Sequence, residues 1–154
     1  MTIKYTRTTT LVPALKVTAV GDWTDLCLAE DAVLDPGEFR PVSLGIRMQL
    51  PKGFEAWVLP RSSTGKRKKV LMYNSMGIID ESYCGPNDIW HALFYAPMGA
   101  VLMEGERLCQ FRIMPKMQAG ILTKLRWLFT REVRFVEVED FDAKDRGGLG
   151  STGK

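Results

Sequence analysis

Hydrophobic and polar residues alternate along most of this chain with the two-residue period of β-strands. The clearest case is VSLGIRMQL at residues 42–50, where Val, Leu, Ile, Met and Leu occupy every second position and Ser, Gly, Arg and Gln lie between them. Such alternation predicts one half-buried strand. Turn-forming residues flank the segment, in LDPGEF before it and in LPKGF after it.

Shorter segments of the same kind follow, separated by Gly and Pro at intervals of about eight to twelve residues. They read EAWVLP, GIID, WHALFY, AVLM, RLCQFRIM and REVRFVEVE. This spacing predicts a sandwich, a jelly roll or a barrel. With 154 residues the chain has the length of one ordinary domain. We therefore expect one all-β domain over residues 1–140.

One segment departs from the strand pattern. In AGILTKLRWLFTRE, at residues 119–132, apolar residues recur at helical spacing among Lys and Arg. We expect a short amphipathic helix near 121–131, inserted between strands. Its apolar face can pack on its own subunit, cover a neighbour or touch a membrane surface. Ordinary packing within the subunit is the preferred interpretation.

Charge and composition point to a cytoplasmic protein. No apolar stretch approaches the ~20 residues that span a bilayer, so we expect no membrane association. The net charge of +3 is mild, and no nucleic-acid partner is expected. The basic run at residues 66–69 is a solvated loop or a phosphate contact.

The cysteines and the histidine offer little chemistry of their own. The three cysteines lie far apart and form no CxxC pair, so we interpret them as reduced thiols rather than zinc ligands. His91 is the only histidine of the chain and lies in the apolar run DIWHALFYA. We interpret it as a structural residue, packed or partly exposed.

Three blocks carry polar residues that a strand protein does not need. In LPRSSTGK, an arginine and two serines directly follow a strand, and such a group can grip phosphate oxygens. YNSMGIIDESYCG reads as a hairpin in which Asn74 suits the edge of a pyrimidine. Asp80, at its end, is either a base that orients water or a turn residue that caps backbone amides. Tyr83 either faces a sugar or fills the core. In MEGERLCQFRI, Gln110 lies on a sheet face and belongs to a site or is half exposed.

Together with DWTDL near the first strands and the tail RGGLGSTG, these blocks resemble the motifs of the trimeric dUTPase family. The five segments DWTDL, PRSS, NSMGIIDESYCG, GERLCQ and RGGLGSTG occur in the order of that family's motifs and span nearly the whole chain. The resemblance implies a jelly-roll-like dUTPase fold. It also implies hydrolysis of dUTP to dUMP and pyrophosphate with Mg²⁺ as cofactor.

The resemblance assigns a role to each matching residue. Asp80 would activate the water that attacks the α-phosphorus. Asn74 and the hairpin at Gly77 and Ile79 would read uracil, and Tyr83 would stack under the deoxyribose. Asp25 would support the water shell of Mg²⁺. The phosphates would be bound by Arg61, Ser62, Ser63 and Gln110, with Arg146, Ser151 and Thr152 of the arm closing over the γ end. Leu149 of the arm would give apolar cover to the base.

The tail departs from the family pattern at two points. Leu149 stands where the family has a Phe that stacks on uracil, and the spacing after Arg146 is shorter than the common form. Because stacking of a base on an aromatic ring contributes about 1 to 3 kcal/mol, we expect weaker substrate affinity or arm closure. The resemblance implies a homotrimer in which a flexible arm, residues 141–154, reaches from one subunit to another.

Two alternatives remain at this stage. The related dCTP deaminases share the sheet, but they need Ala-Arg after the serines, where this chain has Gly65 and Lys66. The other alternative is a dUTPase-like binding protein that uses nucleotide as a regulatory signal. The Asp at position 80 favours turnover, since a pure binder has no need of it.

Overall fold

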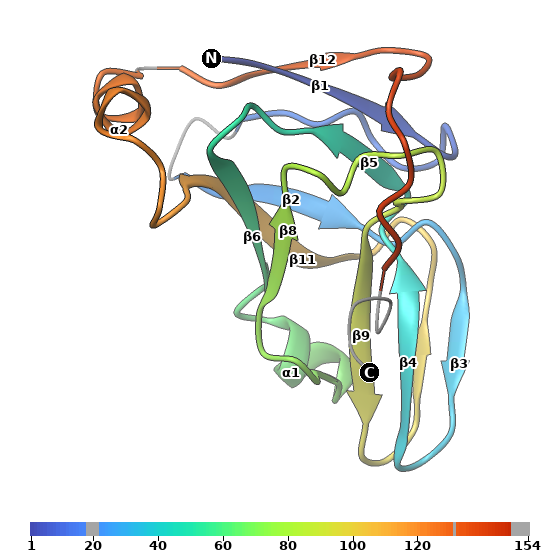
Figure 1. Cartoon of the computed structure of the whole chain (residues 1–154). Helices are drawn as coiled ribbons and strands as arrows, with labels where there is room; N and C mark the ends of the chain where they lie inside the picture. Colours follow the sequence, from blue (N-terminus) through green and yellow to red (C-terminus); the bar gives the residue numbers. More distant parts are fainter. Residues whose placement is uncertain (18–21, 131, 149–154) are drawn as a thin grey trace.

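A computed structural model describes residues 1–17, 22–130 and 132–148 of the chain and shows a molecule built mainly from β-strands (Figure 1). The strands of this described part are β1 (Thr2–Arg7), β2 (Thr24–Cys27), β3 (Ala32–Leu34), β4 (Glu38–Ser43), β5 (Ile46–Gln49), β6 (Phe54–Pro60), β7 (Leu71–Met72), β8 (Gly77–Asp80), β9 (His91–Ala96), β10 (Ala100–Leu102), β11 (Arg107–Pro115) and β12 (Arg134–Glu137). Its helices are α1 (Thr64–Lys68) and α2 (Ile121–Leu128). The predicted all-β class with an inserted helix is confirmed.

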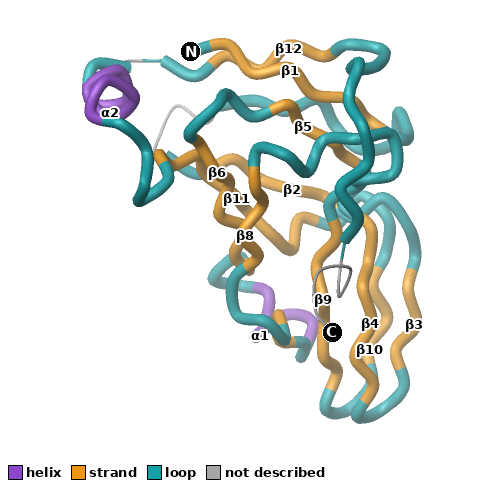
Figure 2. The backbone as a smooth tube through the Cα atoms, viewed as in Figure 1, coloured by secondary structure: helices purple, strands orange, loops and turns teal. Residues whose placement is uncertain are grey.

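Within the described residues the strands form four small sheets. Figure 2 shows the loops that join these strands. The strand orders in these sheets are β12-β1-β5, β10-β3, β2-β11-β6-β8 and β4-β9-β7. The pair β1–β12 is parallel, and the other pairs are antiparallel. In the largest sheet, β11 pairs with β6 from Cys109↔Pro60 to Pro115↔Phe54. This sheet carries most of the residues that the sequence singled out.

The segment 42–50 is two strands, so the prediction of one continuous strand is wrong. The chain breaks between β4 and β5, and these strands lie in different sheets. At the break Gly45 has φ +64°, and a Cβ there would lie 2.5 Å from the Cβ of Ala29. A residue with a side chain would therefore clash and also adopt an unfavourable conformation. The apolar alternation continues across the break because the apolar residues on both sides of it are buried, namely Val42, Leu44, Ile46, Met48 and Leu50.

The core lies between the sheets and is filled by alternate residues of the strands. From Phe54 to Val58 of β6 and from Cys109 to Ile113 of β11, every second residue is buried, and the residues between them are partly exposed. Trp90 packs edge-on against Phe111 with ring centroids 5.4 Å apart. Burial of each such side chain contributes about 1.5 to 3 kcal/mol. The opposite face of this sheet is left for polar residues, among them Gln110 of β11 and Asp80 of β8.

The basic run at 66–69 is not a loop, because most of it belongs to the short helix α1. The buried hydroxyl of Thr64 at the start of α1 donates a 2.7 Å hydrogen bond to the carbonyl of Leu108. This bond ties α1 to the start of β11. It also fixes the serines that precede α1 at one end of the large sheet.

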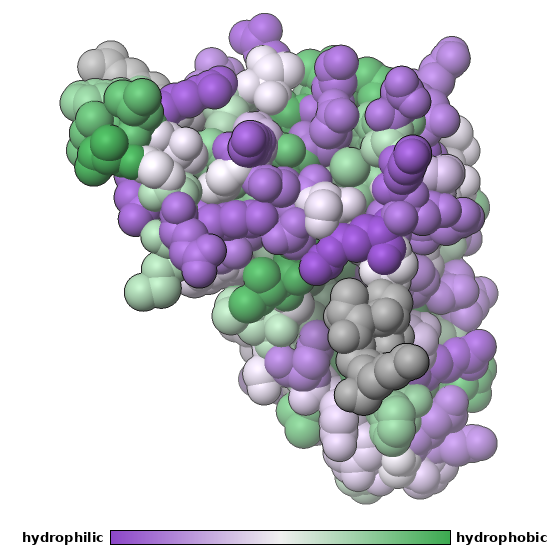
Figure 3. All heavy atoms as spheres, in the orientation of Figure 1, coloured by the Kyte–Doolittle hydropathy of each residue, from purple (hydrophilic) through white to green (hydrophobic). Residues whose placement is uncertain are grey.

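Helix α2 confirms the predicted helix, but only part of its apolar face packs on its own subunit. Trp127 makes an edge contact with Phe54, with ring centroids 6.0 Å apart. The other large apolar side chains are between 42% and 79% exposed, at Ile121, Leu122, Leu125, Leu128 and Phe129. Figure 3 shows them as a hydrophobic patch over α2. Among the described residues, no helix is long and apolar enough to cross a membrane.

Candidate active site

Strand β8 carries the predicted catalytic carboxylate at its end. β8 pairs with β6, and the register places Asp80 opposite Glu55. The prediction of a hairpin is therefore wrong, because β8 does not pair with the preceding strand β7. That strand pairs with β9 in another sheet. A tight turn joins β7 to β8, with Ser75 at φ +60° and its N–H bonded to the carbonyl of Met72 at 2.9 Å.

Three donors from the described residues bind the carboxylate of Asp80. Its Oδ1 atom accepts hydrogen bonds from the backbone N–H and the hydroxyl of Ser82, at 2.9 and 2.7 Å. Its Oδ2 atom lies 2.6 Å from Nζ of Lys116. The turn interpretation of Asp80 is confirmed by the first two bonds. The pair with Lys116 is an additional contact that a turn does not require.

These donors keep Asp80 ionised. Partial burial acts to raise its pKa, but the hydrogen bonds from Lys116 and Ser82 outweigh burial and lower the pKa to about 2. Burial acts on Lys116 in the opposite direction, yet its bond to Asp80 leaves the pKa of the ammonium group raised. At neutral pH the site therefore holds a carboxylate and an ammonium in direct contact.

Tyr83 lies on the same turn as Asp80. Its N–H bonds to the carbonyl of Asp80 at 3.0 Å, and its hydroxyl donates to the carbonyl of Ile89 at 3.1 Å. The ring is half buried, and burial together with the charges of Asp88 and Asp145 raises the pKa of the phenol. Tyr83 thus stays protonated at neutral pH and presents a fixed ring.

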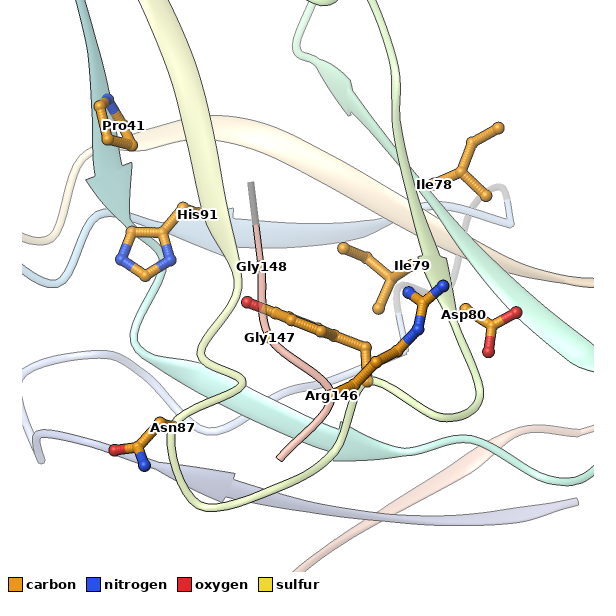
Figure 4. A pocket seen from close by; sticks show the side chains of 10 residues that line it. Pro41, Ile78, Ile79, Asp80, Asn87, His91, Arg146, Gly147 and Gly148 are labelled. Carbon is orange, nitrogen blue, oxygen red and sulfur yellow. The ribbon is translucent and has the colours of Figure 1, made fainter. Parts of the chain in front are cut away.

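A cavity of about 410 Å³ opens beside these residues. Figure 4 shows Asp80 and Arg146 on one side of it and Pro41 and His91 on the other. His91, expected to be structural, is exposed at this wall, with Nδ1 2.8 Å from the carbonyl of Ile89. The cavity is lined by Pro41, Ile78, Ile79, Asp80, Tyr83, Asn87, His91, Arg146, Gly147 and Gly148.

The loop after Tyr83 binds the start of the tail through hydrogen bonds within the same chain. The carboxylate of Asp88, which is 1% exposed, accepts hydrogen bonds from the N–H groups of Gly85, Arg146 and Gly147 at 2.8, 2.9 and 3.0 Å. Asn87 donates its backbone and side-chain N–H groups to Asp145, each at 2.7 Å. The described end of the tail therefore forms one wall of the cavity.

The other predicted phosphate-binding residues form a second cluster near α1. Arg61 Nε lies 2.8 Å from Oδ1 of Asp25, and Arg107 Nη1 lies 3.3 Å from Oδ2. Gln110 is partly exposed and donates a long 3.4 Å hydrogen bond to the carbonyl of Pro60. A further cavity of about 650 Å³ is lined by Arg61 and Ser62 together with residues 70–73 and Ser75.

The chain thus distributes the predicted site over two places. Ile79, Asp80, Tyr83 and Arg146 line the first cavity, and Arg61 and Ser62 line the second. Ser63 is the N-cap residue of α1, Asn74 lies in the turn that leads into β8, and Gly77 is the first residue of β8. Leu149, Ser151 and Thr152 lie outside the described residues.

Three residues of the site were not found from the sequence. Asn87 and Asp88 end the segment GPND at residues 85–88. Its Pro, Asn and Asp residues indicate a turn whose side chains can bind backbone amides. That signal did not reveal that the amides belong to the tail, 58 residues later. Lys116 lies outside the motif blocks and reaches Asp80 across 36 residues.

The acidic residues near the second cluster suit Mg²⁺ only in a limited way. Within residues 1–17, 22–130 and 132–148, no group of three or more His, Cys, Asp or Glu side chains is arranged to hold a metal ion. Asp25 already contacts two guanidinium groups. Mg²⁺ commonly keeps several waters and is held by one or two carboxylates together with substrate phosphates. The donor set therefore fits a metal that arrives with a phosphate substrate.

Comparison with known sequences identifies the relatives of this chain. A model of the dUTPase family matches residues 23–152. The chain is 48% identical over 133 residues to the SPbeta prophage-derived deoxyuridine 5'-triphosphate nucleotidohydrolase of Bacillus subtilis, covering 86% of this chain and 84% of that protein. It is 32% identical over 131 residues to the deoxyuridine 5'-triphosphate nucleotidohydrolase of Leifsonia xyli, with 84% and 77% covered.

Solved structures agree with this assignment. The dUTPase from Streptococcus mutans superposes with a TM-score of 0.66 at 26% identity, over 76% of this chain and 98% of that one. The dUTPase from phage phi11 of S. aureus shares the fold with a TM-score of 0.66 at 15% identity, over 91% and 97% of the two chains. The jelly-roll-like fold expected from the motifs is confirmed by these superpositions.

Proposed function

This chain belongs to the dUTPase family, and we propose that it hydrolyses dUTP to dUMP and pyrophosphate by attack of water on the α-phosphorus, with Asp80 activating that water. One observation carries the assignment of Asp80. Its carboxylate is ionised and lines the first cavity next to Tyr83. A carboxylate accepts about four hydrogen bonds, and the three donors of the described chain leave an acceptor position for water.

The base and the sugar would be read by β8 and the turns at its two ends. Asn74, Gly77 and Ile79 would bind uracil through an amide side chain and backbone groups, in a space too tight for a 5-methyl group. The ring of Tyr83 would lie under the deoxyribose and crowd a 2′-hydroxyl. A site that hydrogen-bonds its substrate discriminates strongly, because an analogue leaves buried polar groups unpaired.

The phosphates would be bound by residues from both clusters. Arg61, Ser62, Ser63 and Gln110 lie in or next to the second cluster, whereas Arg146 lies in the first cavity. The tail residues Leu149, Ser151 and Thr152 would complete the cover. Phosphoryl substitution depends mainly on positioning and on neutralising charge, and arginines and hydroxyls supply both.

The division into two cavities supports an assembly with shared sites. In a homotrimer, Arg61 and the serines of one subunit would face Asp80 and Tyr83 of another. The tail begins on its own chain at Asp88, and its remaining residues would extend over the bound nucleotide.

Mg²⁺ would be held by the substrate phosphates, with Asp25 supporting its water shell. When bound, the ion neutralises phosphate charge and polarises the phosphoryl oxygens. The ion pair between Arg61 and Asp25 orients both side chains, and Arg61 lines the second cavity. Arg61 is thereby directed by a carboxylate of its own chain before substrate binds.

The substitution Asp80→Asn tests the role of Asp80. The amide has nearly the shape of the carboxylate but is not a base, so turnover should fall by about 10² to 10⁴-fold. Binding of dUTP, measured by calorimetry on the inactive variant, should persist. Asp35→Asn in the exposed β3–β4 turn is the matched control and should keep full activity. Retained turnover in Asp80→Asn would remove Asp80 from this role.

A further inference from the structure

We propose that Lys116 is a positioning residue of the reaction, which orients the Asp80 carboxylate, and that the β5–β6 turn, supported by α2, holds Lys116 in place. This inference rests on the proposed role of Asp80. It concerns a residue outside the five motif blocks, which end at Gln110 on β11 and resume in the tail.

The contact is close and complements the other bonds of Asp80. Ser82 holds one carboxylate oxygen, Oδ1, through two hydrogen bonds. Lys116 holds the other oxygen, Oδ2, at 2.6 Å. A carboxylate bound at one oxygen can still tilt about its side-chain torsions, and a second bond at the other oxygen opposes that motion. Lys116 therefore sets the direction in which Asp80 presents its remaining acceptor position.

Lys116 is itself anchored by the β5–β6 turn. Its backbone N–H donates to the carbonyl of Gly53 at 2.9 Å. The N–H of Gly53 donates to Oε2 of Glu81, and Oε1 of Glu81 lies 3.5 Å from Nζ of Lys116. Backbone and side chain of Lys116 are thus fixed by one closed ring of contacts. Three-quarters of the side chain is shielded, with 24% exposed, which limits screening of the pair by solvent.

Helix α2 closes this ring from outside. Gly53 has φ +84°, and a Cβ on it would lie 3.2 Å from Cγ2 of Thr123 in α2. The next residue, Phe54, contacts Trp127 of the same helix. The carbonyl of Lys116 also accepts the N–H of Ala119 at 3.0 Å, in the turn that leads into α2. The inserted helix thereby supports the turn that holds Lys116.

The ammonium of Lys116 also offsets the negative charge of the carboxylates around Asp80. Glu55 lies opposite Asp80 in the β6–β8 register, and Glu81 follows it in sequence. Glu55 is turned to Trp57 by a 2.7 Å hydrogen bond from the indole N–H. Lys116 pairs with both Asp80 and Glu81. Without it, the two neighbouring carboxylates would repel each other and the approaching phosphate.

The test compares Lys116→Met with Lys116→Arg, using Lys52→Met as control because Lys52 is exposed in the same β5–β6 turn. Misplacement of a catalytic group by about 1 Å costs on the order of 10²-fold. We expect Lys116→Met to lower kcat for dUTP by about 10 to 10²-fold. The KM, and the affinity for a dUTP analogue with an α,β-imido bridge, should change less than about threefold, because positioning of Asp80 acts on the chemical step.

The arginine variant distinguishes positioning from support of the fold. Lys116→Arg keeps the cation and should recover most of kcat, whereas Lys52→Met should match the wild type throughout. An unchanged or increased kcat in Lys116→Met, or a loss that appears in KM alone, overturns the inference. Equal losses in Lys116→Met and Lys116→Arg also overturn it. If the wild-type protein does not hydrolyse dUTP, the proposed function itself fails, and that result is distinct from any difference among the variants.

Discussion

The buried carboxylate of Asp88 accepts a 2.9 Å hydrogen bond from the backbone N–H of Arg146, 58 residues later in the chain. The same carboxylate binds Gly85 and Gly147. It therefore joins the turn after Tyr83 to the start of the tail. Because these bonds hold the base of the tail, the proposed closure of the arm over substrate would cost less conformational entropy than closure of a free segment.

Asp88→Asn should weaken this attachment. The side-chain amide of Asn has an NH₂ group in place of one carboxylate oxygen, and this NH₂ group would face a backbone N–H. At least one hydrogen bond to a charged group is therefore lost. We expect a loss of unfolding free energy of about 2 kcal/mol or more and a KM for dUTP raised about tenfold, with a smaller change in kcat. Urea unfolding and steady-state kinetics measure the two effects. The exposed Asp142 provides the control Asp142→Asn, and a KM equal in both variants would contradict the attachment.

Tyr83 should determine selectivity against ribonucleotides. Tyr83→Ala removes the ring, and the ratio of kcat/KM for dUTP to that for UTP should fall by about tenfold or more, since one small group in a pocket is worth about 10 to 200-fold. Tyr83→Phe keeps the ring and should keep the ratio. It loses only the hydroxyl bond to Ile89, with a stability cost of about 1 kcal/mol. A ratio that is unchanged in Tyr83→Ala would show that the ring does not crowd the 2′ position.

Gly45→Ala should destabilise the fold. A left-handed conformation costs a residue with a side chain about 1 to 2 kcal/mol, and the added Cβ would also meet Ala29 at 2.5 Å. We expect a total loss of about 2 to 4 kcal/mol, as for other strained or overpacked sites. Gly37→Ala is the control, since Gly37 also has a positive φ but its Cβ would meet nothing within 4 Å. Equal losses in the two variants, measured in urea, would leave no role for the contact with Ala29.

The low pKa of Asp80 should appear in the pH dependence of stability. Its folded value of about 2 lies below the usual 3.8, so the carboxylate binds protons more readily in the unfolded chain. Its contribution to stability is complete above about pH 4 and is lost as the pH falls toward 2. The difference in unfolding free energy between wild type and Asp80→Asn should therefore shrink from pH 5 to pH 2.5. A difference that stays constant over this range would contradict the ion pair with Lys116.

The sequence predicted the parts of the site that depend on local order. Asp80 and Tyr83 lie three residues apart, and the turn that joins them brings both to one cavity. Lys116 and Asp88 were not predicted, because their partners lie 36 and 58 residues away and only the tertiary fold brings them close. Asp80 and Tyr83 were therefore predicted, and Lys116 and Asp88 were not, because of the distance along the chain to their partners rather than because of their residue type.

The fold shows the same limit. Periodicity placed β6, β8 and β11 nearly at their observed bounds. It did not reveal the break at Gly45, since the apolar alternation continues through that residue. It predicted α2 but not the direction of its apolar face, because helical spacing shows that a face is apolar without showing what covers it.

The most direct test of the account is to offer dUTP, dCTP, dTTP and UTP separately with Mg²⁺ and to measure pyrophosphate and ammonia from each. The account predicts pyrophosphate from dUTP, far less from the other three nucleotides, and no ammonia. Ammonia from dCTP would instead indicate a deaminase, and binding of dUTP without turnover would indicate a regulatory binding protein. Either result would contradict the proposal that Asp80 activates water for hydrolysis of dUTP.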